Sequence, residues 1–178
     1  EGLPVKRKYP FRALVDITYG CNNFCSYCIV PYTRGREVSR GPEDILSEVR
    51  NAVKSGTKEV MLLGQNVNSY EYGFSKLLGN LSQVEGLKRI RFMTSHPKDM
   101  TEDLIKAFSK YHNLSKHLHL PLQSGSDNVL SRMNRGYTKE KYLQLIKDIR
   151  REVPDIGITT DIITGFPGES EEDFQETL

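Results

Sequence analysis

Three cysteines, the only ones in the chain, lie within one stretch of eight residues: Cys21, Cys25 and Cys28. Cysteine thiolates are the usual ligands of iron–sulfur clusters, and three of them on one short loop can bind three irons of a cubane cluster. The sequence supplies no fourth cysteine, so one iron would stay open to a substrate or a cofactor. We therefore predict a [4Fe-4S] cluster that is bound by these three cysteines and reacts at its open iron.

Other uses of three clustered cysteines fit this pattern less well. A disulfide framework would need an even number of cysteines spread over the chain. Structural zinc would need a fourth ligand, and the nearest histidine in the sequence is His96. A thioredoxin-like pair of Cys25 and Cys28 would leave Cys21 without a role. Two other classes stay open: an iron–sulfur module for electron transfer or sensing, and a zinc-stabilised RNA-binding domain.

The composition is that of an ordinary globular domain. The chain has 178 residues, of which 37% are hydrophobic and 27% charged, and its net charge is only +2. That length allows one sizeable core. No apolar run is long enough to cross a membrane, and no signal-peptide pattern opens the sequence, so we expect a cytoplasmic protein. Basic residues occur in small groups, such as residues 6–8 and the pair Arg34 and Arg36.

The elements that must position the cysteines alternate between strand and helix. Pro42 suits the first position of a helix, and Gly56 is placed to end it. The patterns predict strands at residues 12–19, 58–63, 89–94, 117–123 and 156–164, and helices at 42–55, 74–84 and 101–111, after Thr138 and after Ser170. This order predicts an α/β fold with a parallel sheet, in which the loops with unusual sequences follow the strands.

Several segments together resemble the methylthiotransferase branch of the radical S-adenosylmethionine enzymes. They are the cysteine motif with its continuation and the segments after the later strands, at residues 21–40, 63–70, 94–99, 120–126 and 161–169. The resemblance covers the whole chain. It implies a radical S-adenosylmethionine core domain at residues 1–178, a partial barrel of the six-unit (βα)6 type with about five βα units present. It also implies that the family's auxiliary-cluster domain and carboxyl-terminal RNA-binding domain are absent, so we expect a fragment.

The same resemblance implies that S-adenosylmethionine is the second cofactor, and it assigns five residues to it: Tyr27, Gly64, Gln123, Arg135 and Asp161. In the family, a glycine segment receives the methionine amino group, a glutamine and an aspartate meet the ribose, and an arginine pairs with the methionine carboxylate. A guanidinium fork suits a carboxylate. Four of these residues also have a plainer interpretation: a polar turn for Gly64, a barrel amide for Gln123, a surface charge for Arg135 and a tie between loops for Asp161.

Two features limit which functional residues can be assigned from the family. The second glycine and the acid that usually follow Gly64 are replaced here by Gln65 and Asn66. His117 and His119 alternate along one predicted strand, and we interpret them as packed barrel residues without a chemical role. The sequence predicts no catalytic side chain.

The reaction implied by the resemblance is methylthiolation of tRNA. Cleavage of S-adenosylmethionine would give a 5′-deoxyadenosyl radical, which would take a hydrogen from carbon 2 of N6-isopentenyladenosine next to the anticodon. The implied partners are the tRNA anticodon loop and an electron donor protein, with Arg34 and Arg36 as contacts to phosphate. The alternatives within the branch are a threonylcarbamoyladenosine tRNA and a ribosomal protein. Neither the set of tRNAs nor the oligomeric state follows from the sequence.

Overall fold

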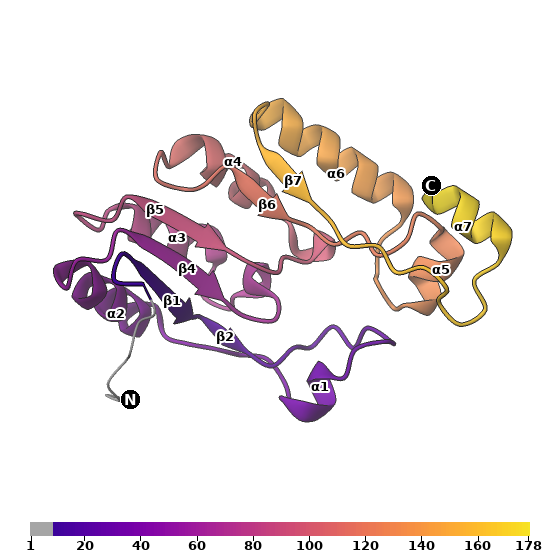
Figure 1. Cartoon of the computed structure of the whole chain (residues 1–178), viewed down its shortest axis with the longest axis horizontal. Helices are drawn as coiled ribbons and strands as arrows, with labels where there is room; N and C mark the ends of the chain where they lie inside the picture. The colour runs from indigo at the N-terminus through magenta and orange to yellow at the C-terminus, as the bar shows by residue number, and fades with distance from the viewer. Residues whose placement is uncertain (1–8) are drawn as a thin grey trace.

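The parallel strands of the chain lie side by side in sequence order (Figure 1). The structure is a computed structural model that describes residues 9–178. β1 (Arg12–Asp16), β4 (Glu59–Leu63) and β5 (Arg89–Phe92) form one parallel sheet, and β6 (His117–His119) and β7 (Gly157–Thr159) form a parallel pair. A parallel bridge between Ile90 and Leu114 joins β5 to the segment that leads into β6. This arrangement confirms the predicted α/β fold with a parallel sheet.

A helix follows each of these strands, and all of these helices except the last bury side chains in the core on one face of the sheet. These helices are α2 (Pro42–Lys54), α3 (Phe74–Ser82), α4 (Glu102–Lys110), α6 (Lys139–Glu152) and α7 (Glu171–Thr177). Side chains alternate along a strand, so Ala13 and Val15 are buried in the core that the helices close, whereas Leu14 is 61% exposed on the opposite face. The five βα units fit a partial barrel.

The predicted helix ends agree with the structure where a residue dictates them. Pro42 is the first residue of α2, and Gly56 has a φ of +100° just beyond its end. The hydroxyl of Thr138 accepts a hydrogen bond from the backbone of Lys141 at the start of α6. Ser170 caps α7 through a reciprocal capping box with Asp173. The caps at Thr138 and Ser170 fix where α6 and α7 begin, after the loops at the carboxyl ends of the strands, and those loops carry the candidate site.

The prediction of one strand over residues 12–19 is wrong at its far end. The parallel pairing stops at Asp16, and the next short strand, β2 (Thr18–Tyr19), pairs antiparallel with β3 (Val38–Ser39). Ile17 is the turning point, because its N–H still donates to Leu63 while its carbonyl accepts from Arg40. The ribbon formed by β2 and β3 directs the cysteine segment away from the sheet, and Figure 1 shows that segment projecting from the body.

The strands predicted at 117–123 and 156–164 are shorter in the structure. Regular pairing ends at His119 and Thr159: the N–H of Leu120 still donates to the carbonyl of Thr159, but the N–H of Leu122 donates to the side-chain hydroxyl of Thr160 instead of a backbone carbonyl. One bridge between Gln123 and Ile162 brings the two segments together again further on. Two helices were not predicted, α1 (Val30–Thr33) and α5 (Asp127–Arg132), nor were the 3-10 turns η1 (Val67–Ser69) and η2 (Pro97–Asp99).

The face of the sheet opposite the helices carries charge at the amino ends of the strands. Arg12, Glu59 and Arg89 are register partners on three neighbouring strands. The Glu59 carboxylate lies 2.7 Å from Nε of Arg12 and 3.1 Å from Nη1 of Arg89. No helix within residues 9–178 is both long enough and apolar enough to span a membrane. The basic group at residues 6–8 lies outside the described residues.

Candidate functional site

The three cysteines lie on a loop whose two ends are tied together. Gly20 has a φ of +73°, and a Cβ atom at this position would lie 2.2 Å from the carbonyl oxygen of Arg36. Only glycine allows this close approach of two backbone segments. The N–H of Cys21 donates to the carbonyl of Gly35 at 3.2 Å, directly beside the ribbon of β2 and β3. These backbone contacts, together with a hydrogen bond from the N–H of Glu37 to the side-chain oxygen of Asn22, close the loop over residues 20–36.

The thiols of this loop are all free, but they differ in exposure. Cys21 is buried, whereas Cys25 and Cys28 are half-buried. The N–H of Cys28 donates to the carbonyl of Cys25 at 2.9 Å, which holds these two residues in one tight turn. Burial raises the pKa of the Cys21 thiol, and the N–H of Asn23, 3.5 Å from the sulfur, acts in the opposite direction. A metal centre bound by Cys21 would therefore have to displace the proton of this thiol.

The donor set suits an iron–sulfur cluster better than a single metal ion. Within residues 9–178, no three His, Cys, Asp or Glu side chains are grouped in a way that could hold one metal ion. A tetrahedral zinc site would need such convergence. A cubane cluster places each thiolate on a different iron, so its three cysteines need not converge on one point. Cys21, Cys25 and Cys28 are thus the residues that could hold a [4Fe-4S] cluster.

A second segment, residues 132–135 at the end of α5, holds the cysteine loop from one side. The N–H of Ser26 donates to the carbonyl of Met133 at 3.1 Å, and its hydroxyl donates to the carbonyl of Arg132 at 2.9 Å. The side-chain amide of Asn134 donates to the carbonyl of Phe24 at 3.1 Å, where the backbone of Phe24 has a φ of +47°. More than a hundred residues of sequence separate the two segments, so these contacts depend on the tertiary fold.

Arg135 connects the cysteine loop to the end of β6. It is only 5% exposed, and its Nη1 lies 3.4 Å from the sulfur of Cys25 and 3.2 Å from the hydroxyl of Tyr27. Its Nε donates to the hydroxyl of Tyr137 at 2.9 Å, and its Nη2 donates to the carbonyl of Pro121 at 3.0 Å. Burial raises the pKa of Tyr27 well above its usual range, and the Arg135 charge opposes this. The alternative interpretation of Arg135 as a surface charge is therefore wrong, because the side chain is buried.

Gln123 and Asp161 come together through their backbones. The N–H of Gln123 donates to the carbonyl of Asp161 at 2.9 Å, and its carbonyl accepts from Ile163 at 2.8 Å. Gln123 is buried at a φ of +76°, a conformation that costs free energy for a residue with a Cβ and that often occurs at functional sites. The carboxylate of Asp161 is largely exposed and lies 3.2 Å from Nε2 of His119. His119, for which we predicted no chemistry, is therefore the neighbour of Asp161.

Gly64 lies at the carboxyl end of β4, where the structure gives it a packing reason. A Cβ atom there would lie 2.0 Å from the hydroxyl oxygen of Thr18 in β2. Any larger residue would push β2, and with it the neck of the cysteine loop, away from the sheet. Gly64 is therefore needed for packing, whether or not its backbone also meets a cofactor.

Sequence reasoning missed a polar network between the loops after β4 and β5. The Asn68 side chain accepts from the N–H of His96 at 2.8 Å and donates to its carbonyl at 2.9 Å. Asn66 donates to the Asp99 carboxylate at 2.6 Å. Burial, and then the nearby charges of Arg135 and Lys98, lower the pKa of His96 to about 3. The only available signal was that residues 63–70 and 94–99 belong to the segments that carry the family resemblance.

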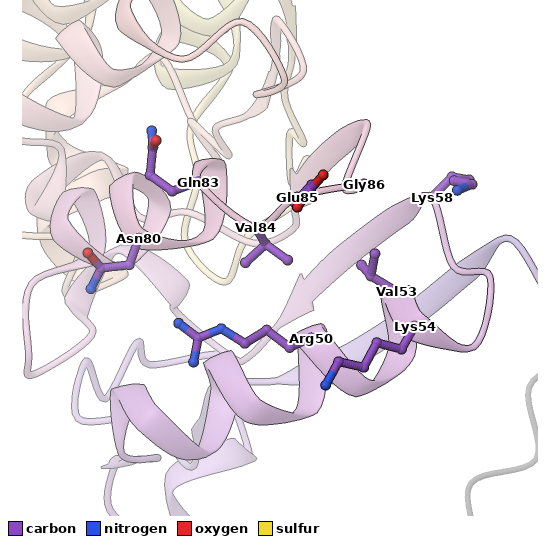
Figure 2. Close-up of a pocket in the computed structure, with 9 residues that line it drawn as sticks. All are labelled: Arg50, Val53, Lys54, Lys58, Asn80, Gln83, Val84, Glu85 and Gly86. Atoms are coloured by element: carbon purple, nitrogen blue, oxygen red, sulfur yellow. The ribbon is translucent and has the colours of Figure 1, made fainter.

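A groove of about 510 Å³ lies between α2 and α3, away from this site (Figure 2). Arg50 and Lys54 line it from α2, and Asn80 lines it from α3. Two further lining residues, Lys58 and Gly86, precede β4 and β5, so the groove lies toward the amino ends of the strands. None of the predicted site residues lines it, and the candidate site is instead the region at the carboxyl ends.

A parallel βα sheet with a closed three-cysteine loop at the carboxyl ends of its strands defines a cluster-binding α/β domain. Comparison with known proteins names the family. The model of the radical SAM superfamily matches residues 15–178, and the chain belongs to that superfamily.

Curated relatives are similar over the whole chain. The tRNA-2-methylthio-N(6)-dimethylallyladenosine synthase of Thermoanaerobacter sp. (strain X514) is 59% identical over 184 aligned residues, which take in 100% of this chain and 39% of the relative. The protein of the same name from Clostridium tetani (strain Massachusetts / E88) is 57% identical, with 100% and 41% covered. The chain thus spans about two fifths of the length of these relatives.

Solved structures show the same fold at low sequence identity. The radical S-adenosylmethionine methyltransferase TsrM from Kitasatospora setae, with cobalamin and a [4Fe-4S] cluster bound, matches with a TM-score of 0.74 and 18% identity, covering 90% of this chain and 32% of TsrM. The cobalamin-dependent S-adenosylmethionine radical enzyme OxsB, with aqua-cobalamin bound, matches with a TM-score of 0.71 and 13% identity, covering 92% of this chain and 25% of OxsB. These likenesses confirm the predicted radical SAM type of barrel.

Proposed function

We propose that the chain binds a [4Fe-4S] cluster through Cys21, Cys25 and Cys28, and S-adenosylmethionine at the iron without a cysteine. The observation that carries this proposal is the buried contact of Arg135 with the sulfur of Cys25. It places a cationic fork, able to bind a carboxylate, beside the loop that would hold the open iron.

The chain's own residues supply binding and shielding. The cluster and S-adenosylmethionine together supply a carbon-centred radical that can take a hydrogen atom from a substrate. Arg135 holds the methionine carboxylate, the backbone at Gly64 receives the methionine amino group, and Gln123 and Asp161 bind the ribose. Tyr27 covers the cofactor from the cysteine loop, where its hydroxyl already lies 3.2 Å from Arg135.

The substrate that we propose is tRNA, at an N6-isopentenyladenosine next to the anticodon, which becomes methylthiolated at carbon 2. The support is 55 to 59% identity over the whole chain to relatives named for this synthase. The chain would be the part of such an enzyme that generates the radical, with electrons from an electron donor protein. The hydrogen of carbon 2 would leave with 5′-deoxyadenosine, and a methylated sulfide from the auxiliary-cluster domain that the resemblance implies would take its place, with the released electron passing to that cluster. We place it in the cytoplasm, where free thiols such as these stay reduced.

Anaerobic reconstitution tests the cofactor assignment. With iron and sulfide, the chain should take up one four-iron cluster, with the visible absorbance of an iron–sulfur protein, and with a strong reductant it should cleave S-adenosylmethionine to 5′-deoxyadenosine. Cys25→Ala should abolish both. Ile29→Ala, which alters an exposed side chain directly after Cys28 but no ligand, is the matched control. Stoichiometric zinc in a colourless protein that takes up no iron would refute the proposal.

Nucleoside mass spectrometry tests the substrate assignment separately. Cells whose own gene carries Cys25→Ala should lose the methylthio group from isopentenyladenosine in their tRNA and keep the isopentenyl group. Loss of the methylthio group from threonylcarbamoyladenosine, or from a ribosomal protein, with isopentenyladenosine unaffected, would assign the chain to another substrate of the same chemistry.

A further inference from the structure

Exposed apolar side chains gather on the segment that projects from the body of the molecule. Tyr32 is 75% exposed, Ile29 65%, Val38 64% and Tyr19 58%, and Phe24 is 39% exposed beside them in the sequence. We call these five residues the cysteine-loop patch. Large apolar side chains left in water so close together commonly mark an interaction site. Phe24, Ile29 and Tyr32 lie on the loop that carries the three cysteines, and Tyr19 and Val38 lie on the ribbon of β2 and β3 at its neck.

The rings of the patch are held in defined positions. Phe24 and Tyr32 lie edge to face, with centroids 6.0 Å apart and planes at 86°. Tyr19 and Val38 are opposite each other across the ribbon of β2 and β3, so their side chains lie on the same face. The guanidinium of Arg34 lies over the ring of Tyr19, 5.8 Å from its centroid. The patch is therefore a set of oriented aromatic faces with one cation stacked on them.

The support under the patch is rigid. The neck at Gly20 closes the loop, and Asn134 fixes the carbonyl of Phe24 from the other side of the site. The hydroxyl of Thr33 donates to the carbonyl of Ile29 at 3.2 Å, which stabilises the short helix α1 that presents Tyr32. A surface that is ordered before its partner arrives loses little conformational entropy on binding.

The charge around the patch is positive. Within residues 9–178, neither Arg34 nor Arg36 forms an ion pair with a carboxylate. The nearby carboxylate of Glu37 is instead turned toward Ser69, whose hydroxyl donates to it at 2.7 Å. Proteins bind single-stranded bases of RNA by stacking them on aromatic rings, while nearby cations contact the phosphates. The patch combines such rings with arginines that form no ion pair within the described part of the chain.

We propose that the cysteine-loop patch binds unpaired bases of the RNA substrate by stacking on Tyr32 and on the Tyr19–Arg34 pair. This inference rests on the proposed function for the identity of the substrate as RNA. It adds the surface that would hold the RNA loop beside the cluster. The patch would bind any accessible base, because stacking does not read hydrogen-bonding edges.

Fluorescence anisotropy with the chain and a labelled RNA hairpin that has an adenine-rich unpaired loop tests the proposal. Tyr32→Ala should weaken binding of the hairpin about 5- to 150-fold, the range measured for loss of one stacked base, whereas Tyr32→Phe should keep the affinity. Arg34→Ala should weaken binding and lower the salt dependence by about one unit of slope. Tyr72→Ala, at an exposed tyrosine outside the patch, is the control. A blunt RNA duplex, which offers no unpaired loop base, should bind Tyr32→Ala and Tyr32→Phe as tightly as wild type.

Several results would overturn the proposal. One is unchanged hairpin affinity in Tyr32→Ala and Arg34→Ala; if Tyr32→Ala does not fold, Arg34→Ala alone decides. An equal loss of hairpin and duplex affinity in Tyr32→Ala would show that the patch does not stack unpaired bases. Normal RNA affinity, together with slower reduction of the cluster by a ferredoxin or flavodoxin, would make the patch a protein docking site. Cleavage of S-adenosylmethionine without RNA reports on the proposed function and should be unaffected by Tyr32→Ala, so the two failures are distinguishable.

Discussion

His96 makes the stability of the chain sensitive to acid. The side chain lies in the turn after β5 and is only 6% exposed. Its Nδ1 accepts the N–H of Lys98 at 3.2 Å, which assigns the ring proton to Nε2 and a neutral imidazole to the folded state. Its ring lies edge to face with Tyr137, 5.8 Å between centroids. A second proton would place a buried charge next to Arg135, so the folded protein resists protonation.

The size of the effect follows from the two pKa values. The pKa of His96 falls from an ordinary 6.5, which applies to the unfolded chain, to about 3 in the folded protein, through burial and then the charges of Arg135 and Lys98. Between these values only the unfolded chain binds the proton, so the free energy of unfolding decreases as the pH falls. From pH 7 to pH 5 this one group should reduce the free energy of unfolding by ~2 kcal/mol.

Urea unfolding of the reduced, metal-free chain at pH 7 and pH 5 measures this effect. His96→Asn should lower the free energy of unfolding at pH 7, because the packing of the ring is lost. Between pH 7 and pH 5, however, the free energy of unfolding of this variant should decrease by ~2 kcal/mol less than that of wild type. His112→Asn, at an exposed histidine, is the control for the substitution itself. The contribution of His117, whose pKa burial also lowers, is common to all three proteins and cancels. Equal pH dependence in wild type and His96→Asn would refute the reasoning.

Two further predictions concern other parts of the site. Arg135→Ala should weaken the binding of S-adenosylmethionine to the reconstituted protein by roughly 1.5 to 3 kcal/mol in calorimetry while the cluster stays in place, and unchanged affinity would contradict the carboxylate assignment. Asp173→Asn should lower the melting temperature at pH 7, because the Asp173 carboxylate accepts from Ser126 at 2.5 Å and this bond, more than any other, lowers its pKa. The difference in melting temperature between wild type and Asp173→Asn should shrink as the pH falls through that lowered pKa. A difference that stays constant would contradict this role of the Asp173 carboxylate.

The parts of the fold that were predictable are those set by local chemistry. Pro42, Gly56 and Ser170 act within one turn of helix, so the sequence shows where α2 and α7 begin or end. The split of the first strand was not predictable in this way. It depends on the pairing of β2 with β3 and on the space that Gly64 leaves for Thr18, and both involve residues distant in the sequence.

The candidate site divides in the same way. The spacing of Cys21, Cys25 and Cys28 predicts the cluster ligands without help from the fold, because all three lie on one loop. The partners of Arg135 could not be read from the sequence, since Cys25 is 110 positions away. The pairing of Asn68 with His96 was also missed, because it joins two loops that meet only when β4 and β5 lie in parallel register.

These long-range contacts bear on how the cluster loop is ordered. Metal sites are rarely preformed, and ligand binding then supplies much of the folding free energy. Here the loop is closed at Gly20 and Gly35 and held through Ser26 and Asn134 by hydrogen bonds that need no metal. The folding of the chain therefore positions the three thiols without a metal. The same hydrogen bonds hold the loop that presents Tyr32 to solvent. Loss of Cys25 should in consequence remove the cluster without unfolding the loop that presents the aromatic rings.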